Sequence, residues 1–350
     1  MISVTVKASK EYEVIIGSDL ISSLGSRLKD FGKYGKVAII SDSNVFSFYG
    51  DQVKSVLENS GFETCSFVLS AGEESKNGEN YLAILNFLAE NHLTRSDTLV
   101  ALGGGVIGDI TGFAAATYLR GISFIQIPTS LLAMVDSSVG GKTAIDLPAG
   151  KNLAGAFYQP DLVLCDITAL KTLPRDNFID GCAEVIKYGI LYDHELFNHL
   201  STYGLDFDRE TVIARCVSLK RDVVAEDEFD TGARQKLNLG HTIGHGVEAY
   251  SNYAITHGKA VAIGTMIVCK SAVAAGICKQ DTLKAISNVL SKFELPLKTS
   301  ATSEELFHYA LSDKKRSGSK INLIVPQKIG DCIIHKINVD DLHAFIKAGL

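Results

Sequence analysis

The sequence predicts two domains of different character: an α/β domain with a mostly parallel sheet and, after it, a mostly α-helical domain. Up to about residue 165, short β-branched runs alternate with helical stretches, which is typical of a parallel sheet covered by helices. Beyond Pro174 the β-like runs nearly vanish, and the apolar residues follow the helical period. No low-complexity linker separates the halves. We therefore expect domains at residues 1–165 and 166–350, packed closely with a cleft between them.

The predicted strands come first along the chain. Residues 1–20 alternate apolar and polar side chains, as a strand pair does. Strands of the parallel sheet are expected at 36–42, 65–69, 98–102, 122–128 and 161–166. Each of these ends in polar or glycine-rich residues. Because ligands of open α/β sheets bind outside the carboxyl ends of the strands, we expect binding residues there.

Five segments of the second half carry apolar residues at helical spacing. They lie at 177–201, 209–226, 239–251, 257–276 and 281–294. This half is therefore predicted to be helical.

Composition limits the classes of function. The chain has 350 residues, 46% of them hydrophobic, which is enough for two folded domains, and its formal net charge is −6. This charge gives a nucleic acid no general attraction, and the apolar runs are too short to span a membrane. The N-terminus shows no secretory signal, and the seven cysteines have no CxxC spacing. We expect a cytoplasmic protein with reduced thiols that binds neither nucleic acid nor membrane.

A glycine-rich turn follows the strand expected at 98–102. Gly103, Gly105 and Gly108 have the G-x-G-x-x-G spacing between a predicted strand and a predicted helix. Such a turn lets the backbone approach a dinucleotide pyrophosphate, although it can also serve only to pack the helix on the sheet. The acidic residue usually found about 20 positions later is missing. Asp42, at the end of another strand, is the better partner for a ribose hydroxyl, unless it only starts a turn.

A cluster of histidines in the helical half indicates a metal site. His241 and His245 are four residues apart and share a helix face, and His257 follows a short break. A pair at this spacing with a third histidine nearby is a recurring arrangement for Zn²⁺. A carboxylate often joins two histidines, and Glu184 is a candidate, with Lys187 on the same side of its helix. The alternatives are separate core or surface histidines and an ordinary surface ion pair.

Five motifs occur in one order along the chain: LGGGVIGDITGFAAATYLRG, IPTSLLAMVDSSVGGKTAID, GKNLAGAFYQP, GCAEVIKYGI and LNLGHTIGHGVE, the last followed by ITHG. Together they resemble the 3-dehydroquinate synthase family of sugar phosphate cyclases over about residues 35–330. The resemblance implies a Rossmann-like NAD-binding domain, a helical metal- and substrate-binding domain, and a homodimer. It also implies NAD⁺ and a divalent metal, Zn²⁺ or Co²⁺, as cofactors.

The reaction implied by the resemblance is a lyase step. It converts 3-deoxy-D-arabino-heptulosonate 7-phosphate, a phosphorylated sugar acid, to 3-dehydroquinate and phosphate, in the shikimate pathway to chorismate and aromatic amino acids. Oxidation of the C5 hydroxyl transfers the hydride on C5 to NAD⁺, which later returns it, while the metal lowers the pKa of that hydroxyl and polarises the new ketone. After β-elimination of phosphate, the opened ring closes by an intramolecular aldol addition.

The resemblance also implies roles for individual residues. It assigns the metal ligands to Glu184, His241 and His257 and leaves His245 to face substrate, whereas spacing alone favours pairing His241 with His245. The implied NAD⁺ contacts are Asp42, Asn44, Ala71, Gly72, Glu73, Glu74, Ser75, Lys76, Gly105, Val106, Ile107, Gly108, Asp109, Thr129, Ser130, Lys142, Lys151, Ala169, Leu170, Lys171 and Thr172. The implied substrate and catalytic contacts are Asp136, Lys142, Asn152, Lys187, Lys220, Arg234, Asn238, His245 and Lys314, with Arg120 reaching across the dimer. The motif does not distinguish Lys314 from its neighbour Lys315.

The charge of the substrate explains the number of cationic residues. A carboxylate and a phosphate need cations on a protein whose net charge is negative, although each lysine or arginine, taken singly, resembles a solvated surface charge. His245 and Lys187 are expected to handle protons, and the alternative is that the departing phosphate itself takes the proton. One departure from the family pattern, Lys259, places a cation two residues from His257 and would weaken metal binding unless it points outward.

Three rival functions remain. Another sugar phosphate cyclase, making an inosose or a valiolone, differs in what holds the substrate carboxylate, and Arg234, Lys220 and Asn152 favour a carboxylated substrate. A metal-dependent polyol dehydrogenase shares the two-domain plan, but the SSVGGKTAID motif argues against it. A catalytically silent NAD-binding protein would not need so many ligating and cationic residues.

Overall fold

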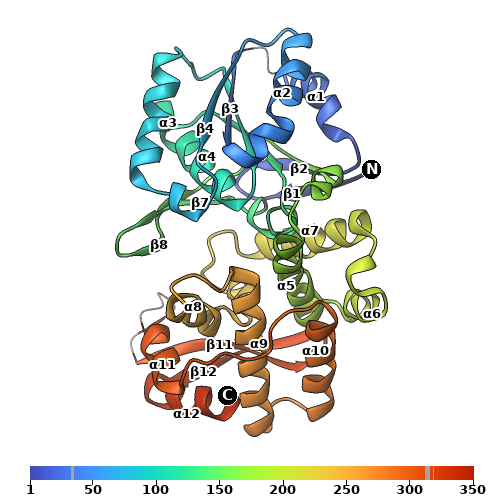
Figure 1. Cartoon of the computed structure of the whole chain (residues 1–350), viewed down its shortest axis with the longest axis vertical. Coiled ribbons are helices and arrows are strands. Elements are labelled where there is room, and N and C mark those ends of the chain that lie inside the picture. Colours follow the sequence, from blue (N-terminus) through green and yellow to red (C-terminus); the bar gives the residue numbers. More distant parts are fainter. Residues whose placement is uncertain (33–34, 312–315, 318) are drawn as a thin grey trace. The chain divides into compact units, whose positions relative to one another are not determined.

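A computed structural model of the chain describes residues 1–32, 35–311, 316–317 and 319–350 (Figure 1). The chain divides into two compact units. Unit 1 comprises residues 1–174 and 209–229, and unit 2 comprises residues 175–208 and 230–350. These units differ from the expected division after residue 165, because the chain leaves unit 1 later and returns to it once.

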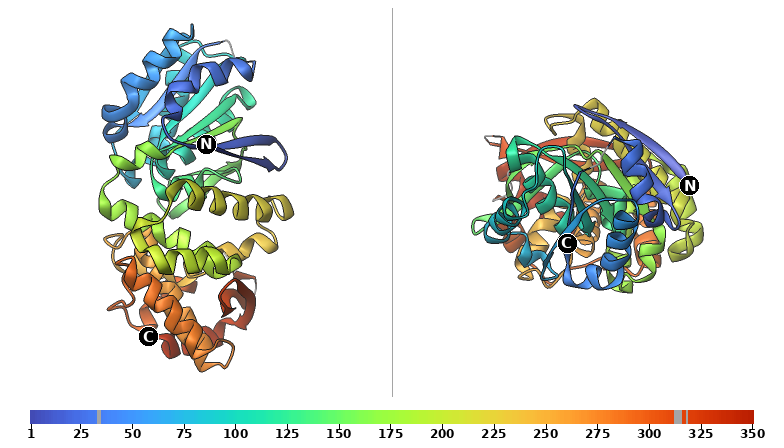
Figure 2. Two further views of the ribbon diagram at one scale, coloured as in Figure 1. Left: turned by 90° about the vertical axis from the view of Figure 1, so that its right-hand side faces the viewer. Right: turned by 90° about the horizontal axis from the view of Figure 1, so that it is seen from above.

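A seven-stranded sheet forms the centre of unit 1, in the order β1-β2-β9-β6-β5-β3-β4. β1 and β2 are antiparallel, and the other neighbours pair in parallel. The predicted N-terminal strand pair and all five predicted parallel strands are present, and Figure 2 shows the β1–β2 hairpin beside the N-terminus. The strands are β1 (Ile2–Lys7), β2 (Glu11–Gly17), β3 (Val37–Asp42), β4 (Thr64–Leu69), β5 (Thr98–Gly103), β6 (Ser123–Pro128) and β9 (Leu162–Asp166).

Helices cover both faces of this sheet (Figure 1). Successive residues of β3 point to opposite faces, so Ile39 packs in one apolar core with Leu57 of α2, and Ile40 packs in another with Ile84 of α3. Strands buried on both faces are continuously apolar, which is why KVAIISD and TLVAL predict strands well. The covering helices are α1 (Leu24–Asp30), α2 (Ser43–Asn59), α3 (Gly78–Glu90) and α4 (Gly105–Thr117).

Two segments that were expected in the helical domain belong to unit 1. η5 (Ile167–Lys171) continues β9, and the carboxylate of Asp166 that caps it also accepts hydrogen bonds from the backbone N–H groups of Asp19 and Ile21, both at 3.0 Å. α7 (Arg209–Glu226) contacts β1, β2 and η4 (Ala133–Ser137). The helical period predicted α7 but not its packing partner, because its buried residues lie on several sides of the helix.

Two antiparallel β structures were not predicted. β7 (Lys142–Leu147) and β8 (Gly150–Phe157) form a hairpin in unit 1. β10 (Arg316–Ser317), β11 (Lys320–Lys328) and β12 (Asp331–Asn338) form a small sheet in unit 2, so the expectation that β structure nearly vanishes after Pro174 was wrong there. β8, GKNLAGAF, lacks the β-branched side chains that mark a strand, and β12 exposes alternate residues.

Unit 2 is otherwise helical, as predicted. The helix expected at 177–201 is two helices, because Asp193 caps the second: its Oδ1 accepts the N–H groups of Glu195 and Leu196 at 2.9 and 3.0 Å. α9 contacts α5, α8, α10 and α12. The helices are α5 (Arg175–Tyr192), α6 (His194–Tyr203), α8 (His241–Tyr250), α9 (His257–Ala274), α10 (Gln280–Lys292), α11 (Ser303–Leu311) and α12 (Val339–Gly349).

Within the described part of the chain, none of the helices has the combination of length and apolarity that crossing a membrane requires.

Candidate active site

α5 carries two charged residues into the interior of unit 2. Glu184 and Lys187 lie three residues apart on one helix face, and their side chains are 0% and 2% exposed. Nζ of Lys187 is in ion-pair contact with Oε2 of Glu184. An unpaired buried charge is costly, so each group needs a partner of opposite charge. The pair is therefore not the ordinary surface pair that sequence spacing also allowed.

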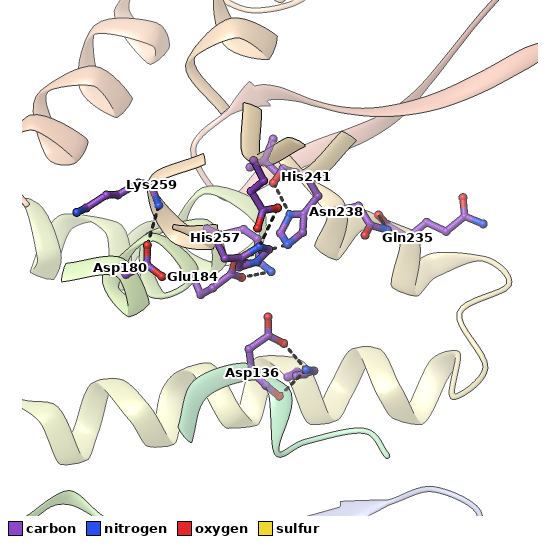
Figure 3. Close-up of polar contacts among 12 residues, drawn as sticks. Asp136, Asp180, Glu184, Gln235, Asn238, His241, His257 and Lys259 are labelled. Carbon is purple, nitrogen blue, oxygen red and sulfur yellow. Dashed lines mark hydrogen bonds and ion pairs between the residues drawn. The ribbon is translucent and has the colours of Figure 1, made fainter. Parts of the chain in front are cut away.

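Two histidines from different helices face the same carboxylate. His241 begins α8 and His257 begins α9, and Nε2 of each lies 3.5 Å from Oε1 of Glu184. The centroids of the two rings are 5.1 Å apart. One ligand atom from each of the three residues lies within 4.8 Å of the other two. Figure 3 shows the three side chains converging from α5, α8 and α9.

Two glycines let these three helices approach one another closely. A Cβ at Gly258, the second residue of α9, would lie 1.9 Å from the carbonyl oxygen of Asp180 in α5. A Cβ at Gly240, which precedes α8 with φ of 76°, would lie 2.6 Å from the carbonyl oxygen of Val261 in α9. Any larger residue at either position would push helices apart that carry the clustered side chains.

Asp180 holds the first turn of α9 against α5. Its Oδ1 accepts hydrogen bonds from Oγ1 of Thr256 at 2.5 Å and from the backbone N–H of Lys259 at 3.0 Å. Asp180 lies one helical turn before Glu184, so the same stretch of α5 holds the start of α9 and faces His257. The Lys259 side chain points away from His257 (Figure 3), so its charge does not face the clustered ligands.

The surroundings of Glu184 fit a divalent cation. Among the described residues its two buried oxygens accept no hydrogen bond of ordinary geometry, although a lysine and two imidazoles lie within ion-pair distance. Nδ1 of His241 lies 3.0 Å from the carbonyl oxygen of Leu239, a contact that assigns the proton to Nδ1 and the lone pair to Nε2. Burial disfavours the charged form of His257, but Glu184 and Glu248 outweigh it and raise the pKa of His257 to about 10. Positive charge is thus favoured here, and one carboxylate with two imidazoles is a ligand set of Zn²⁺.

His245 lies outside this group of three. Its side chain is exposed, and its ring centroid is 5.7 Å from that of His241 and 6.2 Å from that of His257. It belongs to a second group of ligand atoms, with Glu248 and His257. The pairing of His241 with His245 that spacing favoured is therefore not the arrangement in the structure, because a histidine from another helix faces Glu184 instead. Which residues bind a metal stays a prediction.

Sequence reasoning missed two carboxylates beside this cluster, Asp180 and Glu248. Each lies one helical turn away from a residue that the sequence analysis had named as a candidate. Asp180 is four residues before Glu184, and Glu248 is three residues after His245. Extending the search by one helical turn from each candidate ligand would have found both.

η7 (Ala233–Asn238) contains two of the predicted substrate residues. Arg234 is 2% exposed, so it is not the surface arginine that the polar loop EDEFDTGARQK suggests. Asn238 is half-buried, and its Nδ2 donates to the carbonyl oxygen of Gln235 at 3.0 Å. Lys314, the other predicted cation of this half, and its neighbour Lys315 lie outside the described residues.

In unit 1 the glycine-rich turn joins β5 to α4, as its motif predicted. β5 ends at Gly103, and α4 begins at Gly105. A Cβ at Gly103 would lie 2.7 Å from Cβ of Ile107, so this glycine is needed to pack the helix on the sheet. A Cβ at Gly104 would lie 3.5 Å from Oγ of Ser130, which is ordinary contact. The turn thus serves packing and also presents the first amides of α4, which favour an anion.

Asp42 ends β3 and caps α2. Its Oδ1 accepts the backbone N–H groups of Asn44 at 2.9 Å and Val45 at 3.0 Å. Capping by one oxygen is compatible with a ribose contact at the other, since a carboxylate has two acceptors. The hydroxyl of Tyr49 in α2 lies 2.6 Å from Oγ1 of Thr172, so the helix that Asp42 caps contacts the predicted NAD⁺ segment at residues 169–172.

Lys76 joins several predicted NAD⁺ residues into one network. Its Nζ lies 2.9 Å from Oδ2 of Asp109 and 3.6 Å from Oε1 of Glu73, and Nζ of Lys151 lies 3.8 Å from the same oxygen of Glu73. Burial alone would lower the pKa of Lys76, but Asp109 and Glu73 raise it above its usual value. Lys76 therefore stays charged at neutral pH.

Lys220 reaches from α7 to η4, within unit 1. Its Nζ donates to the backbone oxygen of Asp136 at 2.6 Å and is in ion-pair contact with Oδ1 of the same residue. Both residues were predicted to contact substrate. The fold brings together two residues that are 84 positions apart in the sequence.

The remaining predicted residues of unit 1 lie at the ends of elements. Lys142 is exposed at the start of β7. Asn152 has φ of 56°, and its N–H donates to Oδ1 of Asp146 at 2.8 Å. The N–H of Thr129, which follows β6, donates to the end of β5 at 3.0 Å. Arg120 is exposed at the end of η3 (Tyr118–Arg120), and its contact across a dimer stays a prediction.

Solved structures share this fold over nine tenths or more of their length. A 2-deoxy-scyllo-inosose synthase, complexed with carbaglucose-6-phosphate, NAD⁺ and Co²⁺, has a TM-score of 0.90 and 24% identity, with 100% of both chains covered. The glycerol dehydrogenase from Schizosaccharomyces pombe has a TM-score of 0.64 and 15% identity, with 98% of this chain and 91% of that one covered. These likenesses show the fold alone, and the fold is common to an inosose synthase and a glycerol dehydrogenase.

Sequence comparison distinguishes the family. Residues 66–180 match the family model described as 3-dehydroquinate synthase N-terminal, and residues 181–316 match the one described as 3-dehydroquinate synthase C-terminal. The 3-dehydroquinate synthase of Clostridium acetobutylicum is 44% identical over 342 residues, which are 96% of this chain and 96% of that protein. The buried carboxylate, the two imidazoles and the glycine-rich turn all lie within the matched segments. The chain belongs to the 3-dehydroquinate synthase family.

Proposed function

We propose that the chain converts 3-deoxy-D-arabino-heptulosonate 7-phosphate to 3-dehydroquinate and phosphate, a carbon–oxygen lyase reaction of the shikimate pathway. The observation that carries the proposal is the buried carboxylate of Glu184, with Nε2 of His241 and of His257 each 3.5 Å from one of its oxygens. Membership of the family supports the choice of reaction.

Unit 2 holds the divalent cation in this proposal, Zn²⁺ or Co²⁺, through Glu184, His241 and His257. When bound, such a cation lowers the pKa of a coordinated hydroxyl and polarises a carbonyl. Three protein ligands leave one position open, as catalytic zinc sites do. His245 is not needed as a ligand, so its exposed imidazole is available to take and return a proton.

Unit 1 holds NAD⁺, which accepts a hydride and returns it within one turnover. Asp42 binds a ribose hydroxyl, and the first amides of α4 bind the pyrophosphate. The ion pairs of Lys76 with Glu73 and Asp109 hold the three side chains of this part of the proposed site together. Ala71, Gly72, Glu74, Ser75, Thr129, Ser130 and residues 169–172 complete the proposed contacts.

Cationic side chains recognise the two anionic groups of the substrate. Arg234 binds the carboxylate, because a guanidinium makes a planar bidentate pair that lysine cannot reproduce. Lys142 and Lys220 are assigned to the other polar groups, and Asp136 orients Lys220. Lys187 is held beside Glu184 and stabilises negative charge that develops on a substrate oxygen.

The assembly and location extend the proposal. We propose a homodimer, in which Arg120 contributes to the partner's site, and a cytoplasmic enzyme. All seven cysteines are free, and six of them are buried, which suits a reducing compartment. Light scattering of the purified protein tests the dimer directly, and a monomer that is fully active would refute the role of Arg120.

Direct assay of phosphate release from the sugar acid tests the proposed reaction. We expect stoichiometric release of phosphate, a requirement for NAD⁺, and no accumulation of absorbance at the NADH band. Accumulating NADH would instead indicate a polyol dehydrogenase. Release of phosphate from glucose 6-phosphate, which has no carboxylate, but not from the sugar acid would indicate another sugar phosphate cyclase.

A further inference from the structure

Glu248 is a buried carboxylate on the histidine-bearing face of α8. It follows His241 by seven residues and His245 by three, spacings that place all three side chains on one side of the helix. Its Oε2 lies 3.5 Å from Nδ1 of His257, which begins α9. The family resemblance assigns Glu248 no role, and neither does the proposed reaction.

The ring of His257 therefore has a carboxylate at each of its two nitrogens. Nε2 lies 3.5 Å from Oε1 of Glu184, and Nδ1 lies 3.5 Å from Oε2 of Glu248. His241 likewise faces Glu184 through its Nε2. A histidine that binds a metal through one nitrogen usually donates the proton on its other nitrogen to a carboxylate or a carbonyl. Glu248 is positioned to be that acceptor.

The two clustered histidines face acceptors of different strength at Nδ1. Nδ1 of His241 faces the neutral carbonyl oxygen of Leu239, whereas Nδ1 of His257 faces a carboxylate. A hydrogen bond to a charged acceptor is stronger than one to a neutral acceptor, and it makes the imidazole a more basic ligand. Any contribution of Glu248 should therefore be measurable at the metal, through His257.

We infer that Glu248 is a positioning residue for the metal site, which keeps the proton of His257 on Nδ1 and directs Nε2 towards the metal. The inference rests on the proposed function, because it takes Glu184, His241 and His257 as the metal ligands. A second cation bound by His245, Glu248 and Nδ1 of His257 is the competing explanation. That arrangement would require the ring of His257 to lose both of its protons, so the structure favours the positioning role.

Two variants of Glu248 separate its charge from its size. Glu248→Gln keeps the size and an acceptor oxygen but removes the charge, and Glu248→Ala removes both. The matched control is Glu304→Gln. Oε1 of Glu304 lies 3.3 Å from Nε2 of His343, so this change neutralises another glutamate–histidine pair of unit 2 that is not part of the ligand cluster.

The measurements are Zn²⁺ affinity and stoichiometry, by competition with a chromophoric chelator, and the visible absorption spectrum of the Co²⁺-loaded protein. We expect the Zn²⁺ dissociation constant to rise about 10-fold in Glu248→Gln and about 100-fold in Glu248→Ala, with no change in Glu304→Gln. The Co²⁺ spectrum should change in both Glu248 variants, because the orientation of an imidazole ligand alters the ligand field. Circular dichroism and NAD⁺ affinity verify that each variant is folded.

The glutamine variant decides the matter, because it preserves packing. Unchanged Zn²⁺ affinity and an unchanged Co²⁺ spectrum in Glu248→Gln would overturn the inference, and so would two tightly bound Zn²⁺ ions per wild-type chain. If Glu248→Gln weakens Zn²⁺ binding but the wild-type protein releases no phosphate, the inference is supported and the proposed reaction is refuted. If the wild-type protein releases phosphate but Glu248→Gln binds Zn²⁺ as tightly as the wild type, the proposed reaction is supported and the inference is refuted.

Discussion

The two units assemble their site residues in different ways. In unit 1 the residues follow strand ends: Asp42 ends β3, Lys76 comes after β4, Gly105 after β5 and Thr129 after β6. Parallel strands that are neighbours in one sheet end at the same edge, so residues after them are brought together by the topology itself. A binding site of this kind is largely predictable once the strands are recognised.

In unit 2 the clustered residues come from three helices. Glu184 is in the middle of α5, and His241 and His257 begin α8 and α9. Their meeting depends on close helix contacts at Gly240 and Gly258, for which helical periodicity carries no signal. Helical spacing favoured pairing His241 with His245, whereas the two histidines that face Glu184 are His241 and His257. In this chain, sheet topology brings the site residues of unit 1 together, whereas helix packing brings those of unit 2 together.

Removal of the metal should produce the largest difference in behaviour between the two units. Treatment with a chelator should abolish turnover, since the ligands of unit 2 would lose the cation, and added Zn²⁺ or Co²⁺ should restore it. NAD⁺ affinity and helical content should stay unchanged, because each unit has its own apolar core. Activity assays, fluorescence titration with NAD⁺ and circular dichroism of the stripped protein measure these three quantities. Full turnover in protein shown to be metal-free would contradict the proposed role of Glu184, His241 and His257.

Substitution of Arg234 should weaken substrate recognition and leave metal and NAD⁺ binding unchanged. Loss of a charged hydrogen-bonded pair should cost roughly 2–4 kcal/mol of transition-state binding, or about 30- to 1000-fold in kcat/KM, in both Arg234→Lys and Arg234→Ala. Lysine retains the charge but not the bidentate geometry, so it should not rescue. Steady-state kinetics, metal content and NAD⁺ titration are the measurements. Kinetics equal to wild type in both variants would remove Arg234 from the substrate site.

Alanine at two glycines should distinguish packing from cofactor binding. Gly258→Ala should lower stability by about 1–3 kcal/mol and weaken Zn²⁺ binding, because its Cβ would lie 1.9 Å from the carbonyl oxygen of Asp180. Gly104→Ala, whose nearest neighbour would be 3.5 Å away, should change stability by less than about 0.5 kcal/mol. It should weaken NAD⁺ binding, because Gly104 directly precedes the first amides of α4, which are proposed to bind the pyrophosphate. Denaturant unfolding and ligand titrations of both variants provide the comparison. Equal destabilisation of the two would show that unit 1 depends on glycine packing as much as unit 2.

The smallest expected effect concerns two helix caps. Asp42→Ala and Asp193→Ala each remove an aspartate whose Oδ1 accepts two backbone N–H groups at a helix start, so each should cost about 1 kcal/mol. Only Asp42→Ala should also weaken NAD⁺ binding, because Asp193 caps α6 in unit 2. Thermal unfolding and NAD⁺ titration measure both effects. Unchanged NAD⁺ affinity in Asp42→Ala would reduce Asp42 to a cap.

The predicted elements that were found share one property: their pattern is local. Strands buried on both faces are continuous apolar runs, and α7 begins and ends where its period does, at residues 209 and 226. Among the elements that were missed, β8 has no β-branched residue and β10 has only two residues, so pairing with a neighbouring strand defines them more than composition does. The apolar run of β11 is itself a strand pattern that was overlooked. The assignment of α7 to unit 1 likewise depends on its contact with β1, far away in sequence.

The sequence by itself determined the family, the parallel strands of the large sheet, most of the helices between residues 177 and 294, the glycine-rich turn and the residue types that a metal and an anionic substrate need. Those features depend on local periodicity and on motifs, which are readable in one dimension. In the tertiary structure His257 and not His245 faces Glu184, which the family resemblance implied and helical spacing did not. Only the tertiary structure decided that Arg234 is buried and that Glu248 lies at the second nitrogen of His257. These are outcomes of helix packing, in which a difference of a few ångströms between backbones decides which side chains meet, and linear spacing does not contain that distance.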